Sequence, residues 1–460
     1  MRTKQTGSEG KLEIKGQDSS QVNVDSAART ENVKRHITLT FAYKTLAIGL
    51  SYLLVPLVVN YLDVERYGIW VTMLSVMSWV AFFDIGLGNG LRNKLAEALV
   101  VKDIRLAKTY VSTAYVTISG IVSVAFVVLI STARFIPWAK VFNTTSVSSA
   151  ELFKVVLIAG GVSLMNLILS LCNQVFYACQ QASFVAMRQL LMNLFALLAV
   201  FLLIHYTSGT LLYLSAGYGL AMLLSSLLLT EYLYLKRRDI FPSPRYVALG
   251  KVKEIASLGV KFFVIQIAAL IIFTTDNMII IQTLGPAQVT PYNIVFKLFS
   301  IITMAHALIM APLWSAYTDA YAKGDIQWIK NVLKKLNLLM IPIVLVVAVL
   351  IAFTREIVSI WVGSRIEIPY LLPLLMGIYA VVFVWSNVYA YFVNGLGKIR
   401  PQLCSSIIAG IINVPVSIYF ARNLGMGSSG VILGTIVSLS LFAIVGPLQT
   451  YYLVRKKFTE

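Results

Sequence analysis

Apolar segments of about 20 residues recur from residue 37 to residue 453, with short polar breaks between them. A helix needs about 20 apolar residues to cross the roughly 30 Å hydrocarbon core of a bilayer. The chain of 460 residues is 58% hydrophobic and 13% charged, whereas soluble domains are about 45–50% apolar and about 25% charged. Only helices or closed barrels satisfy backbone polar groups in lipid. We therefore predict an all-α integral membrane protein.

Twelve transmembrane helices are predicted, and the long basic segment 235–254 divides them into two sets of six. The predicted spans are 37–61, 69–91, 109–131, 152–178, 183–205, 210–234, 255–283, 289–313, 333–353, 369–394, 401–421 and 428–453. The first and seventh spans then start on the same side of the membrane, which permits two parallel repeats. The remaining segments are a polar tail at 1–36, predicted to be disordered and cytoplasmic, a cytoplasmic linker at 235–254 and a cytoplasmic tail at 454–460.

Lysine and arginine are distributed unequally between alternate loops, which predicts the orientation of the chain. Of the 38 such residues, 27 lie on the side that holds both termini, seven lie on the other side and four lie within spans. We expect both termini to be cytoplasmic. The net charge of +18 is thereby explained by membrane topology, so we do not expect the protein to bind nucleic acid.

The residues that carry most metal and redox chemistry are few. The three cysteines (Cys172, Cys179 and Cys404) lie within or beside apolar segments and form no paired pattern, so neither a disulfide framework nor a zinc site is indicated. No histidine has neighbours at the spacing of a metal site or a catalytic triad. The sequence predicts no cofactor, no metal and no enzymatic activity.

Lys44, Lys261 and Lys297 lie several residues inside apolar spans. A cation within a span costs roughly 2.5–3.5 kcal/mol on insertion scales, so it usually faces a watery cavity or an opposite charge. Lys44 and Lys261 lie about 9–11 Å from the cytoplasmic boundary at 1.5 Å per residue, so they could instead extend to the interface. Lys297 lies in the outer half, where that alternative is weaker. Together they predict a positively charged path and an anionic cargo.

Other polar residues share helix faces with these lysines. Asn293 lies on the same stripe of the eighth span as Lys297, and Asp276 lies on the seventh span, about 22 Å along the helix from Lys261. If they face one lumen, the result is a cationic surface with one carboxylate toward the outer end. Arg188 follows a short cytoplasmic turn; it is either a topological anchor or a further substrate-binding residue.

The segment from Asp84 to Arg92 carries Gly86, Gly88 and Gly90 in a GxGxG run. A dinucleotide loop of that pattern follows a β-strand, and here the run ends a membrane helix, so that interpretation fails. Glycines at a helix end allow either a bend or close approach of another helix. Asp84 and the three glycines are therefore candidates for a gate or hinge.

Four short motifs occur in an order and at positions that resemble the polysaccharide-biosynthesis flippases, of O-antigen and capsule type, within the multidrug/oligosaccharidyl-lipid/polysaccharide exporter superfamily. The motifs are Phe83-Asp84-Ile-Gly86-Leu-Gly88-Asn-Gly90, Thr275-Asp276-Asn277-Met-Ile-Ile with Leu284-Gly285, Pro312-Leu-Trp314-Ser-Ala-Tyr317-Thr-Asp319-Ala-Tyr-Ala-Lys323-Gly324-Asp325, and Asn394-Gly395-Leu-Gly397-Lys398-Ile-Arg400. With the predicted spans, the resemblance covers about residues 37–453.

The resemblance implies two six-helix lobes, 37–234 and 255–453, around a central cavity that opens alternately to the two sides. The implied cargo is a polyprenyl-diphosphate-linked oligosaccharide, moved across the inner membrane of a bacterium for surface polysaccharide synthesis. Lys44, Lys261 and Lys297 would receive the diphosphate, a role that suits lysine as a point charge. Asp276 would pair with a lumen cation or take part in coupling to a proton or sodium gradient. The expected partners are thus the lipid-linked oligosaccharide and membrane lipid.

Two other functions remain open from the sequence. An ion-coupled drug or metabolite antiporter of the same superfamily should line its cavity with carboxylates, but here the candidates are mostly lysines. A membrane polymerase or acyltransferase should have a sizeable outer loop or a clustered polar site, and the outer loops here are short.

Overall fold

The computed structural model describes residues 19–256, 263, 267, 270, 274–310 and 312–459. Within these ranges every regular element is helical. Eleven helices are long and apolar enough to cross a membrane, and they correspond in order to eleven of the twelve predicted spans. In the other span, 255–283, residues 257–262, 264–266, 268–269 and 271–273 lie outside the described residues. The all-α membrane fold is confirmed.

The first half of the chain supplies α1 to α9. Their bounds are α1 (Ser19–Tyr61), α2 (Val64–Ser78), the 3₁₀ helix η1 (Trp79–Asp84), α3 (Leu87–Val100), α4 (Ile104–Ala133), α5 (Trp138–Val141), α6 (Ser149–Leu169), α7 (Leu171–Ala178), α8 (Ala182–Tyr206) and α9 (Leu211–Lys236). The predicted span 69–91 is therefore divided among α2, η1 and the start of α3, because a turn at Ile85 and Gly86 separates η1 from α3.

The second half supplies α11 to α17. The bounds are α11 (Asp276–Leu284), η4 (Pro286–Gln288), α12 (Val289–Met310), α13 (Leu313–Ala322), α14 (Ile326–Val362), α15 (Leu372–Gly395), α16 (Arg400–Ile418), the π-helical turn η5 (Tyr419–Asn423) and α17 (Ser428–Thr459).

Side-chain caps begin several of these helices directly after short loops. An aspartate, serine or threonine at the N-cap accepts a hydrogen bond from the backbone N–H three residues later, which satisfies one otherwise unpaired donor. The caps are Asp63 on α2, Asp103 on α4, Ser148 on α6, Thr210 on α9 and Asp325 on α14. These caps explain why the loops can be short without leaving helix ends unsatisfied.

The structure begins α1 at Ser19, so residues 19–36 are helical here, where the sequence predicted a disordered tail. This stretch contains neither proline nor glycine. A helix already nucleated by the membrane span can therefore propagate back through it at little cost. Residues 1–18 lie outside the described residues.

The segment 235–254 connects the two halves and packs against α4. It contains two short 3₁₀ helices, η2 (Arg238–Ile240) and η3 (Pro244–Tyr246). The backbone N–H groups of Ser243 and Ala248 donate to the hydroxyls of Ser112 and Thr113 on α4, each at 3.0 Å. The predicted linker is thus held against the first lobe.

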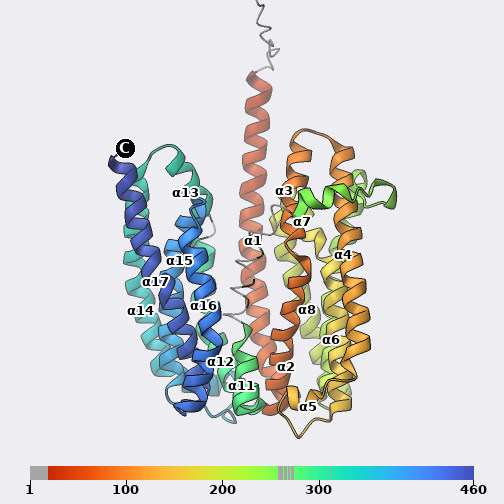
Figure 1. Ribbon diagram of the computed structural model, residues 1–460, viewed down its shortest axis with the longest axis vertical. Coiled ribbons are helices and arrows are strands. Elements are labelled where there is room, and N and C mark those ends of the chain that lie inside the picture. Colours follow the sequence, from red (N-terminus) through yellow and green to blue (C-terminus); the bar gives the residue numbers. More distant parts are fainter. Residues whose placement is uncertain are drawn as a thin grey trace, which may run out of the picture.

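The helices form two lobes, α1 to α9 and α11 to α17, and α1 packs along α8 on the side of the first lobe that faces the second (Figure 1). We call the end where α1 begins and α17 ends the terminal end, and the end that holds α5 and η4 the distal end. Near the distal end α2 lies beside α11 and α12.

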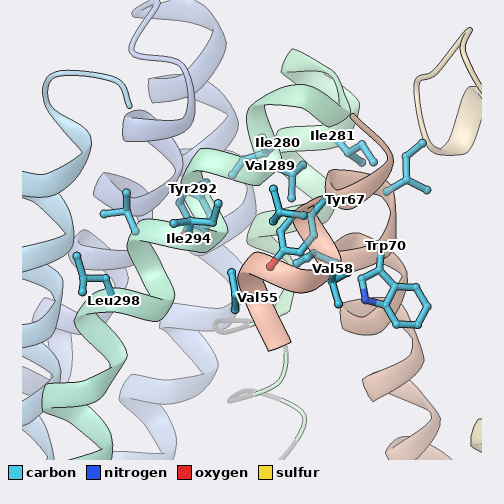
Figure 2. Close-up of a cluster of buried hydrophobic side chains, with 14 of the residues drawn as sticks. Val55, Val58, Tyr67, Trp70, Ile280, Ile281, Val289, Tyr292, Ile294 and Leu298 are labelled. Atoms are coloured by element: carbon cyan, nitrogen blue, oxygen red, sulfur yellow. The ribbon is translucent and has the colours of Figure 1, made fainter. Parts of the chain in front are cut away.

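Buried apolar side chains follow the same division. One cluster joins the lobes through α1, α2, α11 and α12, with Val58 and Tyr67 beside Ile280 and Val289 (Figure 2). A second cluster contains residues of the first lobe, the following linker and Ile255 directly after it, around α3, α4 and α7. A third contains only residues of the second lobe, around α13, α14 and α15. Among the described residues, the lobes therefore share a core toward the distal end and have separate cores toward the terminal end.

Candidate functional site

A cavity of about 460 Å³ lies between the two lobes. Its walls come from α1 and α2 on one side and from α11 and α12 on the other, with one residue each from α8 and α9. Its polar lining consists of Ser51, Ser75, Ser78, Asn193, Tyr67, Tyr218, Thr274, Asp276, Asn277, Tyr292, Asn293, Lys297 and Ser300. A cavity of this size falls in the range of about 300–1,000 Å³ usual for small-molecule sites.

Among the described residues that line this cavity, Lys297 is the one with a positively charged side chain. Its ammonium Nζ donates to the backbone carbonyl of Ser51 on α1 at 2.8 Å and lies 5.5 Å from the centroid of the Tyr52 ring. In the described part of the chain, no carboxylate lies within ion-pair distance of Lys297. A half-buried ammonium with only neutral partners retains unmet attraction for an anion.

A proline in α1 builds the surroundings of Lys297. Pro56 has no backbone N–H, so the carbonyl of Tyr52, four residues earlier, loses its helical partner. The indole Nε1 of Trp361 on α14 donates to that carbonyl at 3.2 Å, and the Trp361 and Tyr52 rings stack with centroids 5.4 Å apart. The Tyr52 hydroxyl in turn lies 2.9 Å from the Ser300 hydroxyl on α12. The second lobe thus supplies the donor for the carbonyl that the proline leaves unpaired in α1.

Asp276 lies at the start of α11, is 5% exposed and lines the same cavity. Its Oδ2 accepts a hydrogen bond from the Tyr292 hydroxyl at 2.5 Å. The Thr435 hydroxyl of α17 lies 3.1 Å from Oδ1 and itself accepts from the Asn413 amide of α16 at 3.1 Å. The carboxyl group is therefore held by neutral donors from α12 and α17, and α16 supports the second donor.

Further hydrogen bonds cross between the lobes around the cavity. The Asn277 amide donates to the Ser75 hydroxyl at 2.9 Å, and the Trp79 indole donates to the Thr274 hydroxyl at 2.7 Å. Asn293, predicted to bind substrate, lines the cavity and accepts from the Tyr67 hydroxyl at 3.3 Å. Asn293 and Lys297 are thus brought together as their helical spacing predicts.

Two predicted lysines do not join them in the described structure. Lys44 is exposed on α1 and does not line the cavity. It precedes Ser51 by seven residues, so it lies on nearly the same face of α1, about 10 Å nearer the terminal end. Lys261 lies outside the described residues.

Arg188 does not line the central cavity, and its role in substrate binding stays a prediction. It lies inside the first lobe, where its Nε donates to Asn173 Oδ1 on α7 and its Nη1 donates to Ser226 Oγ on α9, both at 3.2 Å. The short turn before α8 directs the first turns of that helix against α7 and α9, which explains why this arginine points into the lobe.

The predicted hinge is a left-handed turn between η1 and α3. Ile85 and Gly86 have φ angles of 48° and 77°, and the Asp84 carboxylate accepts from the Gly88 N–H at 2.8 Å. A Cβ atom at Gly90 would lie 1.9 Å from the Ile255 carbonyl oxygen. Asp84 thus caps α3, and Gly90 allows close contact with the segment after the linker. Movement at this turn stays a prediction.

Sequence reasoning missed the aromatic residues around the cavity, Tyr52, Trp70, Tyr218 and Trp361. One signal was present: a proline within a span demands a foreign donor for the carbonyl four residues before it. The identity of that donor depends on how distant helices pack, which the local pattern does not contain.

Comparison with known proteins assigns the chain to a family. Residues 33–317 match the family model described as polysaccharide biosynthesis protein, and residues 262–419 match the MatE model. The first match covers more than half of the chain. The protein belongs to the polysaccharide biosynthesis protein family.

Curated relatives are similar to this chain along nearly their whole length. A putative O-antigen transporter of Salmonella typhimurium is 23% identical over 427 residues, which are 90% of this chain and 95% of that protein. A putative O-antigen export protein of Yersinia pseudotuberculosis is 21% identical, covering 86% of this chain and 90% of the relative.

Solved structures show the same two-lobed fold. An inward-facing multidrug resistance MATE family transporter of the MOP superfamily has a TM-score of 0.70 at 16% identity, covering 92% of this chain and 99% of the other. An outward-facing conformation of such a transporter has a TM-score of 0.63 at 15% identity, covering 93% and 97%. A MOP superfamily transporter from Pyrococcus furiosus, described as having a binding pocket of reverse polarity, has a TM-score of 0.62 at 16% identity. The match covers 92% of this chain and 96% of the other.

Proposed function

We propose that this protein carries a polyprenyl-diphosphate-linked oligosaccharide across the inner membrane of a bacterium for surface polysaccharide synthesis, and that it does so by alternating access. The observation that supports this most is the placement of Lys297. The chain belongs to the polysaccharide biosynthesis protein family. In the described part of the chain, the Lys297 ammonium lies between the lobes and contacts only neutral groups.

The chemistry of that ammonium suits a diphosphate. Lysine binds phosphate as a point charge through short, charge-assisted hydrogen bonds. Moving an ammonium group from water into a low-dielectric interior costs several kcal/mol, and a bound anion would offset part of that cost. Lys44, about 10 Å nearer the terminal end on nearly the same face of α1, would meet the cargo on its way to Lys297. In this proposal the protein transports and performs no covalent step.

The arrangement of the lobes supports an alternating mechanism. Toward the distal end, Gly68 of α2 lies against the Pro286 carbonyl, and the Thr290 hydroxyl of α12 donates to the Val64 carbonyl at 2.5 Å. Toward the terminal end the cores are separate. With both termini cytoplasmic, as the loop charges predict, the structure is the inward-facing state. Transport then requires the distal contacts to break and the terminal ends to close.

Ion coupling is assigned to Asp276 in this proposal. Its carboxyl group contacts α12 through Tyr292 and α17 through Thr435. A proton or a sodium ion at the carboxylate would change these hydrogen bonds and so the packing of α11 against α17. The lobe movement would thereby become sensitive to the gradient of that ion.

A drug antiporter is the second candidate, and the observation that favours it is the carboxylate of Asp276 in the cavity wall. A cationic drug would be attracted by Asp276 and repelled by Lys297, whereas a diphosphate would experience the reverse. The two functions therefore predict opposite charge preferences.

Purified protein in liposomes distinguishes them. The probes are a polyprenyl diphosphate carrying one N-acetylglucosamine, labelled on the sugar, and the cationic dye ethidium. We expect translocation of the lipid-linked sugar and no ethidium transport. Asp276→Asn should remove any response to an imposed proton or sodium gradient. Ethidium transport without sugar-lipid translocation would refute the proposal in favour of the antiporter.

A further inference from the structure

A second cavity, of about 410 Å³, lies inside the first lobe. Its walls come from α2, η1, α6, α8 and α9, with Ser170 between α6 and α7. Four residues line both this cavity and the central one: Trp70, Leu74, Ser78 and Tyr218. We call it the lobe pocket. Because the two spaces share these four residues, they lie side by side.

The lobe pocket has a neutral lining. Its wall combines apolar side chains with Ser163, Asn166, Ser170 and Ser215, and none of the described residues that line it is charged. Such a wall offers no counterion to a diphosphate or to a cationic drug. It suits a neutral ligand that carries both apolar faces and many hydroxyl groups.

Ser215 has a buried hydroxyl that is unpaired in the described structure. It is 2% exposed, and its hydroxyl Oγ makes no hydrogen bond within the described structure. A buried hydroxyl without a partner costs about 1–3 kcal/mol, and most buried hydroxyls in proteins are paired. A ligand hydroxyl in the lobe pocket would supply that partner.

Asn166 is held in one orientation by a chain of hydrogen bonds. Arg188 Nη1 donates to Ser226 Oγ at 3.2 Å, and Ser226 Oγ donates to Asn166 Oδ1 at 2.6 Å. Because the amide oxygen is engaged, the amide nitrogen Nδ2 is the group left for a ligand; it makes no hydrogen bond among the described contacts. Arg188 is therefore a positioning residue for the lobe pocket.

Aromatic rings form the wall between the two cavities. Trp70 and Tyr218 meet edge to face, with ring centroids 5.4 Å apart and an interplanar angle of 81°. Such rings offer an apolar face together with a polar edge, which matches a pyranose ring with its C–H face and peripheral hydroxyls.

From these observations we propose that the lobe pocket binds a sugar ring of the cargo while Lys297 holds the diphosphate. Asn166 Nδ2 donates to a ring hydroxyl or an acetamido oxygen, Ser215 Oγ pairs with a second hydroxyl, and Trp70 with Tyr218 covers the ring face. The inference rests on the proposed function. It makes the lobe pocket the part of the protein that selects among glycans.

The test compares two ligands on purified protein in nanodiscs. One is a polyprenyl diphosphate carrying a single N-acetylglucosamine, and the other is the same lipid diphosphate without sugar. Wild-type protein should bind the sugar-bearing lipid several-fold more tightly. Loss of one hydrogen bond of about 1 kcal/mol corresponds to about fivefold in affinity. Asn166→Ala and Ser215→Ala should each lower affinity for the sugar-bearing lipid by about that factor and leave the bare lipid unaffected.

Two further variants separate positioning from general damage. Arg188→Gln should reduce the preference for the sugar-bearing lipid, because Asn166 loses its fixed orientation, without changing affinity for the bare lipid. Ser225→Ala is the matched control: Ser225 is also buried on α9, but it bonds to the Met222 carbonyl and does not line the lobe pocket. It should retain the wild-type preference.

The outcomes distinguish this inference from the proposed function. If wild-type protein binds both lipids equally, or if the Asn166 and Ser215 variants keep the wild-type preference, the lobe pocket is not a sugar site, while diphosphate transport still stands. If neither lipid binds to wild-type protein at all, the proposed function and the inference both fail.

Discussion

Replacing Lys297 with methionine should separate transport from stability. The substitution removes a charged hydrogen bond to the Ser51 carbonyl, 2.8 Å long, and a cation–π contact of 5.5 Å with Tyr52. A hydrogen bond to a charged group contributes about 1.5–3 kcal/mol. Burying the ammonium costs several kcal/mol, so the two effects oppose one another. We expect the free energy of unfolding to change by about 1 kcal/mol or less.

Lys297→Met should change the affinity for the cargo much more than the stability, because no opposing free-energy contribution offsets the lost contact with the diphosphate. Loss of one charge-assisted contact with the diphosphate, about 1.5–3 kcal/mol, corresponds to a drop of about 10- to 150-fold in affinity. The assay is translocation of sugar-labelled polyprenyl diphosphate into liposomes at subsaturating lipid, together with thermal unfolding of the same preparations. Lys297→Met should lose transport and keep its unfolding temperature within a few degrees.

Two controls sharpen this prediction. Lys297→Arg keeps the charge and should retain most of the activity. Lys154→Met removes an exposed lysine of α6 that does not line the cavity, and it should behave as wild type. Wild-type transport by Lys297→Met, or equal impairment by Lys154→Met, would refute the role of the ammonium.

Three shorter predictions concern other parts of the structure. Trp361→Phe should lower the free energy of unfolding by about 1 kcal/mol, because the carbonyl freed by the proline loses its donor; Pro56→Ala should reduce that cost, which a double-mutant cycle in a denaturation assay would measure. Gly68→Ala should push the distal ends of the lobes apart, because its Cβ would lie 1.9 Å from the Pro286 carbonyl oxygen; unchanged distances between spin labels in the distal loops would contradict this. Outside the membrane, hydrogen bonds from Arg237 hold the pKa of Asp239 below its usual value. The pair therefore stabilises the linker fully at pH values above the unfolded-state pKa of about 3.9. This stabilisation is lost as the pH falls through the lower pKa of the folded state. Asp239→Asn should abolish that part of the acid destabilisation, measured as unfolding temperature between neutral and strongly acidic pH.

Much of the fold could be predicted because the membrane imposes a simple local rule. Each apolar run of about 20 residues must form a helix that satisfies its own backbone, so eleven spans follow from the sequence in the order observed. For residues 19–36 the polar composition predicted disorder, whereas the structure continues α1 back to Ser19. The absence of proline and glycine beside a membrane span is consistent with that continuation.

The position of site residues could be predicted only where those residues lie on the same helix. Asn293 and Lys297 lie on one stripe of α12, and their meeting in the cavity follows from helical spacing. The partners from other helices do not follow from spacing. Arg188 shows the limit: its position in a span was evident, but its direction depends on how α8 packs against α7 and α9, which lies in tertiary structure.

A structure of the protein in nanodiscs with a polyprenyl diphosphate carrying N-acetylglucosamine bound would test the account most directly. We predict density for the diphosphate within hydrogen-bond distance of Lys297 Nζ, between α1 and α12. Density for the diphosphate on the outer, lipid-facing surface of a lobe, with the cavity between the lobes empty, would contradict the account.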